Sequence, residues 1–156
     1  MNFLITGNMR TMLFLTILCF LSCGTDQGET NTYTYIVRNE SGVDVKIVGY
    51  VRFPNQIEEY IITLNNNEER TQIYKDGLPP RGYHFRYLFG STNGNFDANS
   101  VKIVYNNTKF KVYNNENLLE ERNPLGPNHN EGALEATYTL TPDDYENAED
   151  CNGNCE

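Results

Sequence analysis

The sequence predicts an all-β fold, an antiparallel β-sandwich of seven or eight strands with a short helical turn near the C-terminus. Apolar residues recur at every second position from Thr32 onward, which is the period of a strand with one face in the core and one in solvent. Turn residues separate these short runs, and no long amphipathic helix is evident between them. Tyr occurs 11 times and Trp is absent, a composition that suits half-buried strands.

The first half of the domain contains four predicted strands. The clearest is the first, in which Tyr33, Tyr35 and Val37 alternate with polar residues. Asn65 to Asn67 supplies the turn into the fourth, which is polar and charged, and we expect that strand at the edge of a sheet because charges protect an unpaired edge. The four predicted strands are 32–38, 43–52, 57–64 and 70–74.

The second half begins with the strongest break in the chain. Asp76 to Gly82 contains two prolines, which lack backbone donors, and two conformationally permissive glycines. We expect this segment to be a long crossing between two sheets, which favours a sandwich over a small barrel. The aromatic alternation of 83–89 predicts a strand in the middle of the core. The remaining predicted strands are 101–105 and 108–113, joined by a hairpin at Asn106-Asn107, and 134–140.

Two segments near the C-terminus are not predicted as strands. Asn114 to Gly132 is a long polar connection, and such loops are more often functional or disordered than accidental. Thr141 as N-cap, Pro142 at the first helical position and two acids after it predict a helix through about Asp150. With the strands, this order favours a sandwich of immunoglobulin-like or transthyretin-like type.

The N-terminal residues have a different composition. Met12 to Leu21 is a nearly unbroken apolar run, preceded by Arg10 as the only charge in the first 22 residues. A positive segment followed by a short apolar one is the pattern of an export signal. The run is about half of the roughly 20 residues that a membrane-spanning helix needs, so we expect no permanent span. Met1 and Met9 both remain possible starts.

Phe20-Leu21-Ser22-Cys23 resembles the lipobox of bacterial lipoproteins, most closely the relaxed form common in the Bacteroidota, with Phe20 in place of the usual Leu. The resemblance implies cleavage before Cys23 and its acylation with two or three chains, which anchors a protein stably to a membrane. Gly24 after the cysteine implies transfer to the outer membrane, with the domain facing the periplasm or the cell surface. The alternative is an ordinary cysteine after an ordinary cleaved signal peptide.

This interpretation divides the chain into three parts. We expect a lipoprotein signal peptide at 1–22, the lipidated cysteine with a flexible linker at 23–31, and the β-sandwich domain with its helical turn and Cys pair at 32–156. The domain also resembles small Bacteroidota lipoproteins that have no assigned activity, which supports the architecture alone. Four segments carry that resemblance: 76–80, 104–107, 122–125 and 138–148.

The net charge of the chain limits the kinds of molecule that it can bind. The chain has 12 Lys and Arg against 21 Asp and Glu, a formal net charge of −9. Removing residues 1–22 takes away Arg10 and no acid, so the mature chain is more acidic still. Such a surface repels phosphate backbones, which excludes nucleic-acid binding because that needs clustered cations. We expect a monomer attached to the membrane through its lipid.

Catalytic signals are sparse. The sequence has no Gly-x-Ser-x-Gly elbow, no His-Glu-x-x-His and no phosphate loop. His84 alternates with apolar aromatics and is expected as an exposed strand residue, while His129 falls in the long loop. We therefore predict neither an enzyme nor a cofactor.

Two stretches have oxygen ligands at alternating positions, as calcium sites do. Neither matches an EF-hand loop, and turn formation by Asn and Gly explains the same residues, so no metal site is predicted. The weak candidates are Asn93, Asn95, Asp97 and Asn99 in one stretch and Asp150, Asn152, Asn154 and Glu156 in the other.

Cys151 and Cys155 are the pair that remains once the signal is removed and Cys23 is acylated. An even pair in an exported protein indicates a disulfide, and a C-x-x-x-C redox or metal site is the alternative. For the whole protein we predict a non-enzymatic binding or structural module that binds a protein or glycan through a sheet face or the loop 114–132. The alternatives are a glycan-binding accessory lipoprotein and a hydrolase with a site assembled in space.

Overall fold

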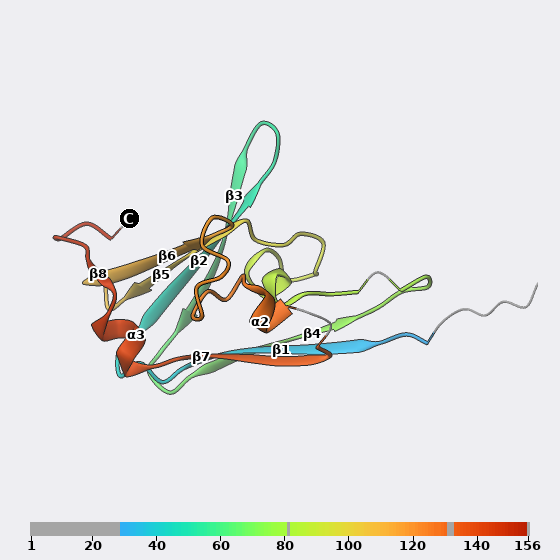
Figure 1. Ribbon diagram of the computed structural model, residues 1–156, viewed down its shortest axis with the longest axis horizontal. Helices are drawn as coiled ribbons and strands as arrows, with labels where there is room; N and C mark the ends of the chain where they lie inside the picture. The colour runs from blue at the N-terminus through green and yellow to red at the C-terminus, as the bar shows by residue number, and fades with distance from the viewer. Residues whose placement is uncertain (1–28, 81, 131–132, 156) are drawn as a thin grey trace, which may run out of the picture.

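The computed structural model describes residues 29–80, 82–130 and 133–155, and over these residues it confirms an all-β sandwich (Figure 1). One sheet has three strands in the order β4-β1-β7, and the other has five in the order β3-β2-β5-β6-β8. The small sheet consists of β1 (Thr32–Asn39), β4 (Glu69–Lys75) and β7 (Glu135–Leu140). The large sheet consists of β2 (Val45–Arg52), β3 (Ile57–Leu64), β5 (Ser100–Tyr105), β6 (Lys109–Asn114) and β8 (Glu149–Asp150).

Most of the predicted strands lie within a few residues of their expected bounds. The polar strand β4 is an edge of its sheet, as predicted. Asn106 and Asn107 have positive φ angles of 46° and 52° and form the turn between β5 and β6. The pairing of β1 with β7 is parallel and differs from expectation. The long connection that precedes β7 allows this direction, whereas a hairpin would impose an antiparallel one.

The chain crosses from one sheet to the other directly after β1 and again after β3, and Asn39 holds these two crossings together. Its buried side chain donates from Nδ2 to the carbonyl oxygens of Val43 and Asn65, at 2.8 and 3.0 Å. Its Oδ1 accepts from the hydroxyl of Ser41 at 2.7 Å. Buried polar groups need such partners, so this asparagine fixes the closed end of the sandwich.

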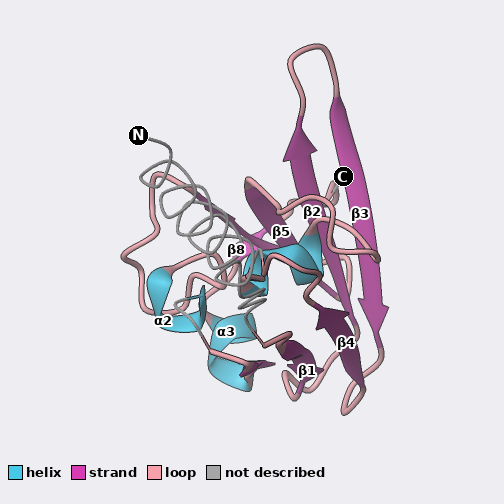
Figure 2. Cartoon of the chain, turned by 90° about the vertical axis from the view of Figure 1, so that its right-hand side faces the viewer, coloured by secondary structure: helices cyan, strands magenta, loops and turns pink. Residues whose placement is uncertain are grey.

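The core lies between the sheets and is built from the inward positions that the alternation predicted. The small sheet contributes Tyr33, Tyr35, Val37, Tyr74, Tyr138 and Leu140. The large sheet contributes Val45, Ile47, Ile62, Leu64, Val101, Ile103, Tyr105 and Tyr113. The sheets diverge away from α3 (Pro142–Glu146), and the short helices η1 (Phe85–Phe89) and α2 (Pro127–Asn130) lie in the opening (Figures 1 and 2).

The prediction of a central strand at 83–89 is wrong, because this segment forms the 3₁₀ helix η1, which contacts β1 of one sheet and β2 and β3 of the other. Phe85, Leu88 and Phe89 are its buried residues, and their spacing is helical. Gly49 of β2 permits the approach, since a Cβ there would lie 1.8 Å from the carbonyl oxygen of Phe89. Apolar alternation alone did not distinguish a strand from a short helix packed between two sheets.

The connection before η1 and the C-terminal helix follow the predictions more closely. Residues 76–80 and Gly82 lie in the crossing from the small sheet to the large one, and the Leu78–Pro79 peptide bond is cis. Thr141 caps α3 in a reciprocal capping box with Asp144. The helix ends at Glu146 and not near Asp150, because the residues that follow form β8 against β6.

Candidate functional site

The outer face of the five-stranded sheet has an unusual mixture of side chains. Because Val45, Ile47 and Val51 of β2 point inward, Lys46, Val48, Tyr50 and Arg52 point outward. Strand register places their neighbours. Lys46 lies opposite Thr63 and Val104, Val48 opposite Ile61 and Lys102, and Tyr50 opposite Glu59 and Ser100.

Three adjoining hollows follow β2 across this face. The first, of about 590 Å³, is lined by Lys46, Val104, Asn107, Gly153, Asn154 and Cys155. The second, of about 270 Å³, shares Lys46, Val104 and Cys155 with the first and adds Val48, Tyr50, Glu59 and Lys102. The third, of about 250 Å³, shares Tyr50 and adds Arg52, Ile57, Asn99 and Ser100. We call these lining residues together the outer-face groove.

The floor of the groove is apolar and its rim is polar. Val48 and Val104 are only 5% and 4% exposed although they lie on an outer face, because longer side chains and the C-terminal segment surround them. That segment lies beside β6 and β8 (Figure 1), and the backbone N–H of Cys151 donates to the carbonyl of Thr108 at 2.8 Å. Cys151 is bonded to Cys155 as a disulfide, which brings Cys155 to the groove wall.

Within the described residues, the cations of the groove have no carboxylate partner. In the described part of the chain, ion pairs involve Arg38, Lys111 and Arg122 but not Lys46, Arg52 or Lys102. The ammonium group of Lys102 lies 5.3 Å from the ring centre of Phe110, a cation–π contact on the same face. These charges remain available to a ligand.

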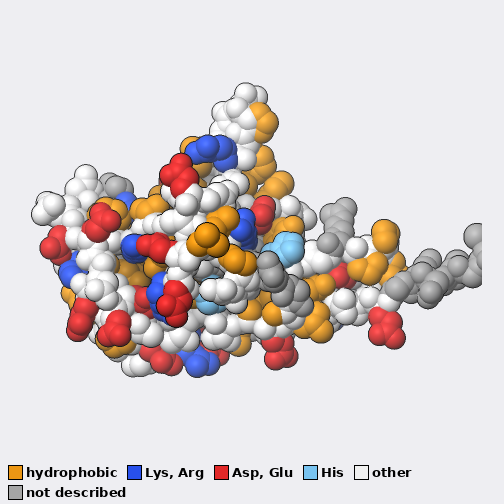
Figure 3. Space-filling model, viewed as in Figure 1, with side chains coloured by type: hydrophobic (Ala, Val, Ile, Leu, Met, Phe, Trp, Pro, Cys, Tyr) orange, Lys and Arg blue, Asp and Glu red, His pale blue; other side chains and the backbone are white. Residues whose placement is uncertain are grey.

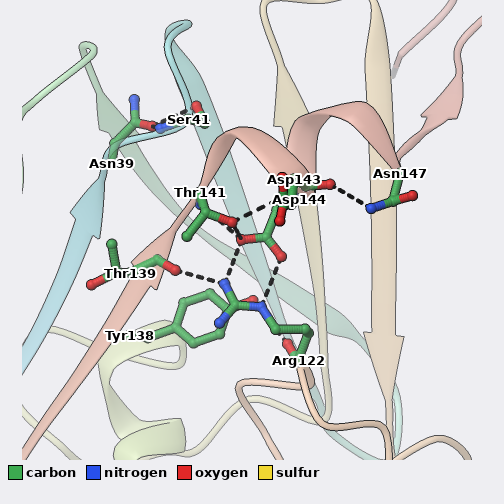
Figure 4. Close-up of polar contacts among 9 residues, drawn as sticks. All are labelled: Asn39, Ser41, Arg122, Tyr138, Thr139, Thr141, Asp143, Asp144 and Asn147. Carbon is green, nitrogen blue, oxygen red and sulfur yellow. Dashed lines mark hydrogen bonds and ion pairs between the residues drawn. The ribbon is translucent and has the colours of Figure 1, made fainter.

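Another hollow, of about 540 Å³, lies beside α3 and is lined by Arg122 and Asp144, the ion pair with the most hydrogen bonds among the described residues (Figure 4). The Nε of Arg122 donates to Oδ1 of Asp144 at 2.8 Å, and its Nη2 contacts Oδ2. Nη2 also donates to the carbonyl of Thr139 at 2.6 Å, and the guanidinium lies 5.1 Å from the ring centre of Tyr138. Thr141 donates to Oδ2 from its backbone N–H and its hydroxyl. We call these five residues the Arg122 junction.

Electrostatics make the Arg122 junction a fixed structural element. Burial alone would raise the pKa of Asp144, but hydrogen bonds from Arg122 and Thr141 outweigh it and hold the pKa below its ordinary value. The hydrogen bond to Asp144 raises the pKa of Arg122, and burial raises that of Tyr138 well above its ordinary value. Each of these shifts moves the pKa of the group further from neutral pH, which favours the charged pair of Arg122 and Asp144 beside a neutral Tyr138.

The predicted site residues are distributed as follows. Cys23 lies outside the described residues, and so does Glu156 of the second calcium candidate. Asn93 Oδ1 accepts from the N–H of Asn95 at 3.3 Å, and Asn99 Oδ1 accepts from the N–H of Arg52 at 2.7 Å. These oxygens serve turn and sheet contacts. No group of three or more His, Cys, Asp or Glu side chains is placed to hold a metal within the described residues.

The two histidines occupy different environments. His84 precedes η1, is exposed and stacks on Tyr87 with ring centres 6.2 Å apart. His129, in α2, packs against the rings of Phe85 and Tyr138, and its buried Nε2 has no hydrogen-bond partner among the described residues. Burial and the charge of Arg122 lower the pKa of His129. The histidines lie apart from the outer-face groove.

Sequence reasoning proposed a sheet face but did not identify the groove residues. The alternation of β2 shows that Lys46, Val48 and Tyr50 share a face with Arg52, so one strand of the groove was detectable. The placement of Lys102 beside Val48 depends on the pairing of β2 with β5, which no local pattern specifies.

Comparison with known proteins identifies no relative of this chain. No protein-family model matches the chain, no curated protein matches it, and no solved structure matches its fold. Among the residues that the structure describes, none of the helices is long and apolar enough to span a membrane.

Proposed function

We propose that the protein is a lipid-anchored, non-enzymatic binding module of the bacterial cell envelope. The observation that carries the binding role is the outer-face groove, which joins an apolar floor to a polar rim and to cations that pair with no carboxylate of the described residues. Ligand sites typically combine an apolar surface with a few polar groups. The resemblance of Phe20 to Cys23 to a lipobox supports the anchor, and Gly24 after the cysteine supports an outer-membrane location.

A rigid sheet suits this role. β2 and β5 each have a hydrogen-bonded strand on both sides, so the groove floor is fixed before a ligand arrives. A preorganised surface loses little conformational entropy on binding. Tethering through acyl chains leaves the domain able to contact components near the membrane surface.

Membrane attachment is tested by replacing Cys23 with Ala in the full-length protein. We expect the variant to be released from the outer-membrane fraction and to carry no label from palmitate. The control is Cys151→Ser with Cys155→Ser, which should remain in the membrane. A Cys23→Ala protein that still carries the label would overturn the anchor.

Binding through the outer-face groove is tested with a photoreactive benzophenone amino acid, which inserts into nearby C–H bonds of proteins and glycans alike. Ile57 lines the groove and is 59% exposed, and Ile73 is 56% exposed on the small sheet. These positions are matched in residue type and exposure. We expect an adduct in intact cells from position 57 and none from position 73, whereas adducts from position 73 alone would place the binding surface elsewhere.

A further inference from the structure

We infer that the outer-face groove takes an elongated acidic glycan, a sugar chain that carries carboxylates; this inference rests on the proposed binding function and names its ligand class. The first support is charge. The protein has a formal net charge of −9, yet the groove contains Lys46, Arg52 and Lys102 with Glu59 as its acid. Charge complementarity of this kind selects an anionic ligand.

The second support is the spacing of these cations. Lys46 and Arg52 are six residues apart on β2, which at about 3.3 Å per residue separates them by about 20 Å. Lys102 lies between them, level with Val48. Cations spread along this length fit a chain with several separate carboxylates better than one small anion. They are too sparse for nucleic acid, which needs a dense basic surface.

The third support is the composition of the middle of the groove. Tyr50 is half-buried there, with Glu59 on the strand to one side and Ser100 on the strand to the other. An acidic sugar chain offers an apolar ring face to Tyr50, hydroxyl donors to the Glu59 carboxylate, and the carboxylates of successive rings to Lys102 and Lys46. An acidic peptide offers Glu59 backbone N–H groups and an occasional hydroxyl, whereas a sugar chain offers hydroxyl donors on every ring.

Strand topology also argues against a peptide. Extended peptides commonly bind by adding a strand to an unpaired sheet edge. The groove instead lies on the face of β2 and β5, and both strands are paired on both sides. A ligand here must contact side chains, and sugars do so through hydroxyls and ring faces.

The test uses the full-length lipoprotein in detergent micelles and a fluorescent oligogalacturonate as the probe, with binding measured by anisotropy. We expect Lys46→Glu with Lys102→Glu to weaken binding by at least about tenfold, since each reversal removes an attraction and adds a repulsion. The matched control is Arg70→Glu with Lys75→Glu, two exposed cations of β4 on the other sheet. This control should bind within about twofold of the unmodified protein, because distant surface charges are screened.

Other outcomes overturn the inference in distinguishable ways. If poly-glutamate binds as tightly as oligogalacturonate, the groove accepts any polyanion and the glycan assignment is wrong. If neutral dextran competes equally and the groove reversals have no effect, the charge argument is wrong. If no probe binds while the cross-linker at position 57 still captures a partner in cells, the glycan inference fails and the proposed function stands. If the cross-linker captures a partner from position 73 alone, the proposed binding function of the groove is wrong as well.

Discussion

The Arg122 junction and the outer-face groove both contain cations, but they use them in opposite ways. Arg122 directs two nitrogens to Asp144 and Thr139 and lies over Tyr138, so the protein itself satisfies most of its bonding capacity. Lys46 and Lys102 lie on a sheet face without a carboxylate partner in the described chain. The surface around α3 is rich in acidic side chains (Figure 3), and yet the groove cations are not paired with them.

We therefore expect the Arg122 junction to contribute to stability and the groove cations to contribute to binding. Breaking a buried ion pair leaves an uncompensated charge and is strongly destabilising, whereas an exposed cation contributes little to stability. Substitutions in the junction should therefore lower the free energy of unfolding, and substitutions of the groove cations should change affinity alone.

The largest effect is expected for Arg122→Met. The side chain of Asp144 is 7% exposed, so its carboxylate would lose its cation in a poorly hydrated place. We expect the free energy of unfolding to fall by about 2 to 3 kcal/mol, below the full value for a buried pair because water reaches Arg122. Denaturant titration measures this change.

The matched control is Lys46→Met, which makes the same kind of substitution in the outer-face groove. It should change the free energy of unfolding by no more than about 0.5 kcal/mol. If both variants lose the same free energy of unfolding, the Arg122 junction does not stabilise the fold more than the groove cations do, and the expectation is wrong.

The next effect concerns the disulfide at the groove wall. Cys151→Ser with Cys155→Ser should lower the free energy of unfolding by about 2 kcal/mol, because a bridge over so short a loop removes little chain entropy from the unfolded state. The unmodified protein should show no titratable thiol from this pair before reduction. Reduction should destabilise it by the same amount and leave the double variant unaffected, and a variant as stable as the unmodified protein would contradict this expectation.

Local sequence patterns predicted the elements that depend on local chemistry. The Asn106-Asn107 hairpin and the Thr141 cap both formed as expected, because turn and capping preferences act within a few residues. The strand prediction for 83–89 failed because this segment packs closely against Gly49, which is far away in the chain. A packing site between two sheets determined its structure, and its own alternation did not.

The candidate site was less predictable than the fold for the same reason. The strand residues of the outer-face groove are ordinary outward residues, and the groove arises only when β2 pairs with β3 and β5 and the C-terminal segment lies against this face. Arg122 and Asp144 are 22 residues apart, in a loop and a helix that no periodicity connects. Pairing between distant segments creates both sites.

A smaller effect is expected in acid. Because the pKa of Asp144 is lowered in the folded state, its contribution to stability is present above the unfolded-state value of about 3.9 and is lost as pH falls through the folded-state pKa. Asp144→Asn should therefore show a flatter decline in unfolding free energy below about pH 4. Asp143→Asn, the exposed neighbour in the same turn, is the control and should keep the steeper decline of the unmodified protein.

The smallest effect concerns His129, which belongs to the interior beside the Arg122 junction. Its pKa is lowered in the folded state by burial and by Arg122, so the unfolded chain binds a proton more readily than the folded one. Its contribution to stability is therefore present above the unfolded-state pKa of about 6.5 and is lost as pH falls through the folded-state pKa. His129→Phe should remove this pH dependence and also remove the Nε2 beside Phe85 and Tyr138, for which the described residues provide no hydrogen-bond partner. The exposed His84→Gln is the control, and thermal unfolding of both variants at pH values from 7.5 to 5 provides the measurement. If His84→Gln flattens the profile and His129→Phe does not, the interior histidine is not the group that titrates.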